Sequence, residues 1–160
     1  RRAAVQGLSQ QYRDRPETFD LIVERVKTDD DSNVRRAAVQ GLSQQYRDRP
    51  ETFDLIVERV KTDDDSNVRR AAVQGLSQQY RDRPETFKLL LSCAAKDPYE
   101  QPREDFPLDF NPRYVALSAL VRHFSEAPET RSVLEDRATN EPDENLRQWI
   151  QEQLQKLAQS

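Results

Sequence analysis

The sequence predicts an all-α fold, an α-solenoid of four helix pairs with a terminal capping helix. Two observations carry this prediction. Residues 1–53 and 35–87 are identical, so a unit of 34 residues recurs without a single difference. Each unit also holds two stretches of helical periodicity separated by short polar turns. Self-similarity at such a period is typical of stacked repeats, in which each layer contacts only its neighbours.

The first helix of the second unit is expected from about Asn33 to Tyr46, with Ser32 or Asn33 as its N-terminal cap. Its apolar residues recur at i, i+3, i+4, i+7 and i+8, the spacing of one helix face: Val34, Ala37, Ala38, Gly41 and Leu42. Val39 and Tyr46 widen this apolar arc. A helix with so wide an arc is expected to contact both its own partner helix and a neighbouring layer.

The second helix is expected to begin at Pro50, because proline is tolerated in the first turn, and to end near Lys61. Its apolar stripe has the spacing i, i+3, i+4, i+7: Phe53, Ile56, Val57 and Val60. Leu55 lies nearly opposite this stripe. Tetratricopeptide units have the same length, but there a proline closes the second helix, whereas Pro50 opens it.

The copies diverge after Phe87, yet the phase of the repeat can be followed to the end. Residues 98–110 form an insertion, after which the apolar pattern resumes. The predicted layers of this single domain are 1–34, 35–68, 69–111, 112–145 and a capping helix at 145–158. Because the sequence starts at Arg1, already inside a helix, the chain is expected to be part of something longer.

Composition and charge narrow the possible functions. The net charge is −4, and each identical unit has six basic and seven acidic side chains, so nucleic acid is not an expected partner. No apolar run approaches the roughly 18 residues that span a bilayer, so no membrane association is expected. A single cysteine fits a reducing compartment, and a cytoplasmic location is expected.

No catalytic, cofactor or metal site is expected, because a catalytic constellation does not usually occur in identical adjacent copies. His123, the only histidine, has no Cys or second His nearby in sequence and is interpreted as a surface residue. Cys93 has no histidine partner in sequence reach and is interpreted as structural. The run Asp29–Asp31 lacks the central Gly and distal Glu of an EF-hand loop and is better explained by helix capping.

The spacing of Asp29, Val34, Arg35, Ala38 and Leu42 resembles the pattern of HEAT repeats. The resemblance implies an armadillo-like superhelix and a role in protein interaction without catalysis. It also implies a ladder between an Asp in one turn and an Arg at the start of the next first helix: Asp29, Arg35, Asp63 and Arg69.

In HEAT-like solenoids the second helices line the concave face, so candidate partner-binding residues lie there. They are a recurring leucine and its acidic neighbours: Leu21, Glu24, Leu55, Glu58 and Leu89. In the alternative interpretation, these leucines pack sideways between adjacent second helices.

The insertion supplies three further candidates for partner binding, Tyr99, Phe106 and Phe110, among acidic residues. The preceding helix has lost charge, with Ser92 and Ala95 where the second unit has Glu58 and Lys61. We expect the loop to fold back over this helix. The alternative is an exposed binding loop with aromatic anchors.

More narrowly, the motif VRRAAVQGL, the Pro-Glu-Thr that opens the second helices and residues 134–143 resemble the C-terminal HEAT repeats of bacterial, notably cyanobacterial, NACHT-family signalling NTPases. The resemblance implies a ligand-sensing region, with any NTPase upstream of Arg1, since no Gly-rich phosphate loop is present. Two alternatives stay open: an engineered or recently amplified scaffold, and a phycobilin-lyase-type subunit.

Overall fold

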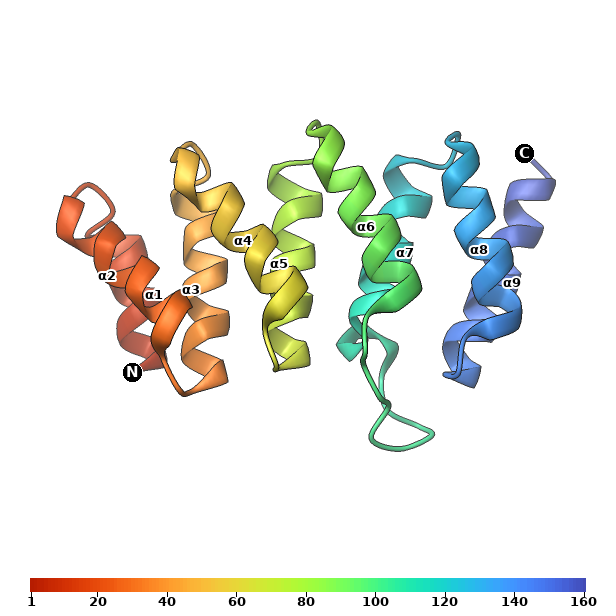
Figure 1. Cartoon of the computed structure of the whole chain (residues 1–160), viewed down its shortest axis with the longest axis horizontal. Helices are drawn as coiled ribbons and strands as arrows, with labels where there is room; N and C mark the ends of the chain where they lie inside the picture. Colours follow the sequence, from red (N-terminus) through yellow and green to blue (C-terminus); the bar gives the residue numbers. More distant parts are fainter. The chain divides into compact units, whose positions relative to one another are not determined.

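The computed structural model describes residues 1–160 and consists of nine α-helices and one short 3-10 helix, without strands (Figure 1). Its contacts divide into two compact units, residues 1–83 and 84–160. The first holds α1 (Arg2–Gln11), α2 (Pro16–Thr28), α3 (Ser32–Gln45), α4 (Pro50–Thr62) and α5 (Ser66–Gln79). The second holds α6 (Pro84–Lys96), η1 (Leu108–Phe110), α7 (Pro112–His123), α8 (Pro128–Asn140) and α9 (Glu144–Ala158). The predicted all-α fold class is confirmed.

The helix starts follow from local chemistry. Proline occupies the first turn of α2, α4 and α8, where its missing N–H costs nothing. Asp31 caps α3 and Asp65 caps α5, each accepting a hydrogen bond from the backbone N–H two residues on. The expectation that Ser32 or Asn33 would be the cap is wrong, because the helix begins at Ser32 and the carboxylate of Asp31 is placed to reach its free N–H groups.

In the first unit, α3 contacts α1, α2, α4 and α5. Its apolar arc is therefore buried on several sides, as the width of the arc predicted. The fully buried side chains of this core include Ile22, Val26, Val34, Leu42, Ile56 and Leu76. Aromatic rings pack between successive layers. Phe19 packs on Tyr46, and Phe53 packs on Tyr80, each with ring centroids 5.2 Å apart.

Consecutive first helices approach closely at a glycine. A Cβ added to Gly75 would lie 3.0 Å from the Cβ of Ser43, whereas one added to Gly7 would meet nothing within 4 Å. This contact also explains why Ser43, although polar, is only 3% exposed. The α3–α5 interface therefore depends on small residues on both sides.

We expect Gly7→Ala to stabilise the chain by about 0.5–1 kcal/mol and Gly75→Ala to destabilise it. The two glycines stand in identical local sequence, so both changes gain the same helix propensity. At position 75 the new methyl group lies 3.0 Å from the Cβ of Ser43, so Ser43 has to move by a few tenths of an ångström in a packed interface. Urea denaturation of the two variants measures the difference, and equal stabilisation by both would show that the close approach is absent.

In the second unit, α6 contacts α7 and α8, and α9 packs on α8. Its core contains the fully buried side chains Leu90, Leu117, Leu120, Leu134, Leu146 and Ile150. Phe87 packs on Phe124 with ring centroids 4.9 Å apart. The insertion leaves the end of α6 and returns through η1 to α7, and Figure 1 shows it extending beyond the ends of these two helices. No helix combines the length and apolar character needed to cross a bilayer.

Candidate functional site

A buried ion pair joins the start of α3 to the turn after α4. The Nε and Nη2 atoms of Arg35 donate to the two carboxylate oxygens of Asp63 at 3.0 and 2.9 Å. The side chain of Asp63 is only 1% exposed. Nη1 of Arg35 donates to the backbone carbonyls of Asp29 and Asp30, so this arginine links two successive turns.

The other two residues of the predicted ladder have related surroundings. Arg69 donates to the carbonyl of Asp63, as Arg35 does to that of Asp29. The buried carboxylate of Asp29 accepts a hydrogen bond from Arg25 on its own layer at 3.4 Å. In the observed pair the aspartate follows the arginine by 28 residues. Arg35 thus reaches Asp63 in the turn that closes its own 34-residue repeat.

The protein holds Asp63 in its ionised form. Burial alone raises the pKa of this carboxyl, but the hydrogen bonds from Arg35 and from the N–H of Asp65 outweigh burial, so the pKa lies below its ordinary value of 3.8. The hydrogen bond to Asp63 is likewise the main cause of the raised pKa of Arg35. Both shifts mean that the charged pair is favoured in the folded chain.

We expect Asp63→Asn to lower the melting temperature at pH 7 and to flatten its fall in acid. Because the folded pKa of Asp63 is depressed, its contribution to stability is fully present above the ordinary pKa of 3.8 and is lost as the pH falls through the lower folded value. The gap between the two melting temperatures should therefore narrow between pH 5 and pH 2. A gap that stays constant with pH would show that Asp63 is not the titrating group.

The second compact unit, residues 84–160, contains an equivalent pair that the sequence reasoning missed. Arg113 on α7 donates through Nε and Nη2 to Glu141, again 28 residues on, and its Nη2–Oε1 distance is 2.6 Å. Nη1 of Arg113 donates to the backbone carbonyls of Asp97 and Tyr99. The constant spacing was a usable signal, but Glu141 stands where the other units have Asp.

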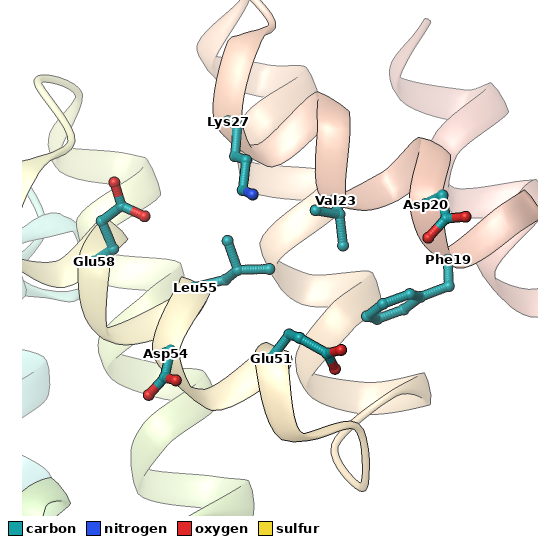
Figure 2. Close-up of a pocket in the computed structure, with 8 residues that line it drawn as sticks. All are labelled: Phe19, Asp20, Val23, Lys27, Glu51, Asp54, Leu55 and Glu58. Carbon is teal, nitrogen blue, oxygen red and sulfur yellow. The ribbon is translucent and has the colours of Figure 1, made fainter. Parts of the chain in front are cut away.

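A groove lies between the second helices α2 and α4 of the first unit (Figure 2). Its volume is ≈ 390 Å³. Phe19, Val23 and Leu55 form an apolar floor, and Figure 2 shows their side chains directed into the space between the two helices. Five charged residues surround this floor: Asp20, Lys27, Glu51, Asp54 and Glu58. An apolar floor with a polar rim is the usual anatomy of a protein-binding patch.

The rim of the groove is acidic and mostly unneutralised. It carries four carboxylates against one ammonium group. Glu58 pairs with Arg59 at 3.0 Å, whereas Asp20, Glu51 and Asp54 are exposed and form no ion pair. Carboxylates gathered beside an apolar wall raise the local negative potential, which attracts cationic groups.

The predicted partner-binding residues of the second helices are distributed unevenly around this groove. Leu55 and Glu58 line it, and Leu55 is only 7% exposed, which favours the sideways-packing alternative at this position. Leu21 and Leu89 are half-buried, and Glu24 is exposed. None of these three lines the groove.

The groove residues that the sequence reasoning missed are Phe19, Asp20, Val23, Lys27, Glu51 and Asp54. Val23 corresponds to Val57, which its periodicity placed in the core stripe, yet both are half-buried. The available signal was the spacing on α4, where acidic side chains stand four residues before and three after Leu55.

The insertion does not cover α6 in the way we expected. Ser92 is exposed and Phe110 is 37% exposed, while Ala95 and Phe106 are half-buried. The loop therefore leaves Ser92 uncovered, whereas Ala95 on the same helix is half-buried. The physical reason lies at the start of the loop, because Arg113 fixes the backbone there and directs the chain past the helix end.

The three aromatic residues of the insertion have different surroundings. Tyr99 is buried at its base, with 7% of its surface exposed. Phe106 and Phe110 pack on each other, with ring centroids 4.9 Å apart. The loop is also tied to the start of α9, because the side chain of Asn145 donates to the carbonyl of Glu104 at 2.7 Å.

The single cysteine and the single histidine lie in different surroundings. Cys93 is buried, and its thiol donates to the carbonyl of Pro112 at 3.6 Å. His123 is exposed at the end of α7. No group of three or more His, Cys, Asp or Glu side chains is arranged to hold a metal ion.

Comparison with known proteins gives one result at the level of the family. The family model of HEAT repeats matches residues 1–77 and again residues 45–106, which together span more than half of the chain. No curated protein and no solved structure matches the chain. HEAT repeats are generally non-catalytic and mediate protein interactions. The helix pairs and this match agree with the predicted α-solenoid, and the chain belongs to the HEAT repeat family.

Proposed function

We propose that this chain is a non-catalytic scaffold that binds another protein through the second helices of its repeats. The observation that carries the proposal is the groove between α2 and α4, with its apolar floor and charged rim. Val23 is half-buried on this floor, so a partner side chain would remove further apolar surface from water. The rim would then supply orientation and specificity.

Site-specific photo-crosslinking tests this proposal. A p-benzoylphenylalanine placed at position 23 faces the groove, and one at position 44 lies exposed on α3 as the matched control. We expect one protein to be crosslinked from position 23 and not from position 44. An excess of the chain without the crosslinker should reduce the yield of this adduct. Equal adducts from both positions, or none from position 23, would contradict binding at the second helices.

A finer proposal is that the chain is the ligand-sensing repeat region of a larger bacterial signalling NTPase. What supports it is the resemblance of VRRAAVQGL, of the Pro-Glu-Thr that opens α2, α4, α6 and α8, and of residues 134–143 to the repeats of NACHT-family proteins. The test is nucleotide hydrolysis by the longer protein with and without residues 1–160. Hydrolysis that rises when they are deleted would support the proposal, and the absence of hydrolysis in both forms would contradict it.

A further inference from the structure

We propose that the groove between α2 and α4 binds a Lys/Arg-rich amphipathic segment of the partner protein, with an apolar side chain of that segment on the floor formed by Phe19, Val23 and Leu55. The inference rests on the proposed function and specifies the chemistry of the partner. The observation that supports it is that the groove has an acidic rim and an apolar floor, which are complementary to such a segment.

The charges of the groove are available to a ligand. Asp20, Glu51 and Asp54 are exposed and form no ion pair. The arginines on the same helices are engaged elsewhere, because Arg25 pairs with Asp29 and Arg59 pairs with Asp63 as well as with Glu58. At these three carboxylates a cationic ligand therefore does not have to displace an existing ion pair, whereas at Glu58 it shares the carboxylate with Arg59.

The spacing on α4 suits an elongated partner. Glu51, Leu55 and Glu58 follow one another at i, i+4 and i+7 along one face. At 1.5 Å per residue the two glutamates are separated by roughly 10 Å along the helix axis. A helical segment with basic residues at the same spacing and an apolar residue between them would present its charges to both glutamates at once, with the apolar residue over Leu55.

The chain itself shows that two acidic residues of the rim can be replaced without loss of the helix. Asp54 and Glu58 correspond in register to Lys88 and Ser92 on α6. The first helical turn is otherwise unchanged, and α6 has the same length as α4. Asp54→Lys with Glu58→Ser is therefore a substitution that this fold already accepts at the same positions of the repeat.

The experiment measures binding of a synthetic peptide of about 14 residues, roughly the length at which isolated helices become marginally stable. Its lysines stand at i and i+7 with a leucine at i+4, and a matched peptide has glutamate in place of each lysine. Fluorescence anisotropy is recorded with the full chain, with the Asp54→Lys/Glu58→Ser variant, and with Asp14→Lys/Asp48→Ser. The last variant makes the same charge change at two exposed turn residues outside the groove.

We expect the lysine peptide to bind the full chain and the turn variant alike, and to bind the groove variant at least about tenfold more weakly. Its affinity should fall as salt rises, and the glutamate peptide should not bind. Equal loss in the two variants would show that net charge alone attracts the peptide, and equal affinity for all three proteins would place binding elsewhere. If the peptide fails to bind while crosslinking from position 23 persists, the basic partner is wrong but the scaffold function stands.

Discussion

Replacing Arg113 with alanine is expected to lower the free energy of unfolding by about 3–5 kcal/mol, because it leaves a buried carboxylate without its partner. The side chain of Arg113 is 5% exposed and that of Glu141 is fully buried. In that variant the Glu141 carboxylate keeps Arg137 at 3.9 Å, while Arg147 donates to the backbone carbonyl of Glu141. The substitution also removes the donors to the carbonyls of Asp97 and Tyr99, which lie at the start of the insertion.

Urea denaturation followed by circular dichroism measures this loss. Arg131→Ala is the control, because Arg131 pairs with Glu135 at 2.9 Å on the exposed side of α8, and such a pair contributes at most about 0.5 kcal/mol. The double change Arg113→Met/Glu141→Leu should recover part of the stability, because an apolar pair of similar volume avoids the desolvation penalty but does not replace the donors to the carbonyls of Asp97 and Tyr99. A cost below about 1 kcal/mol for Arg113→Ala would mean that the buried pair is not formed.

Hydrogen exchange separates the two roles of Arg113. If the arginine also holds the base of the insertion, the amides next to Tyr99 should exchange faster in Arg113→Ala than in a variant of equal global stability. The N–H of Tyr99 donates to the carboxylate of Asp97, so its protection reports on this turn directly. Unchanged exchange at Tyr99 would confine the role of Arg113 to the pair with Glu141.

The elements of this fold were predictable because their signals are local. Proline in the first turn placed the starts of α2, α4 and α8, and the apolar spacing from Val34 to Leu42 placed α3, since each depends on residues within one helix. The partner of Arg35 depends on how one layer stacks on the next. Only the structure shows that it is Asp63, 28 residues away.

The groove and the insertion were harder to predict for the same physical reason. The period of a helix says which residues share a face, but not how far two faces are separated, so Val23 was assigned to the core although it reaches the α2–α4 groove. Similarly, the loss of charge at Ser92 predicted a cover, yet a small uncharged residue is also compatible with solvent, and Ser92 is exposed.

Leu42→Ala is expected to cost about 2–5 kcal/mol, whereas Leu8→Ala should cost clearly less. The two leucines occupy the same position of identical units, so helix propensity does not distinguish them, although Asp31 caps α3 and α1 has no side-chain cap. Leu42 is fully buried in a helix that contacts α1, α2, α4 and α5, while Leu8 is half-buried in α1. Truncation of Leu42 therefore leaves a cavity that few neighbours can fill.

The difference between the two variants isolates the contribution of stacking. If stability is close to a sum of layer and interface terms, the extra cost at position 42 is the part of the interface energy that depends on this side chain. Urea denaturation of both variants gives this difference directly. Equal costs at positions 8 and 42 would mean that the leucine acts within its own helix pair, and that contacts between layers contribute little to holding α3 in place.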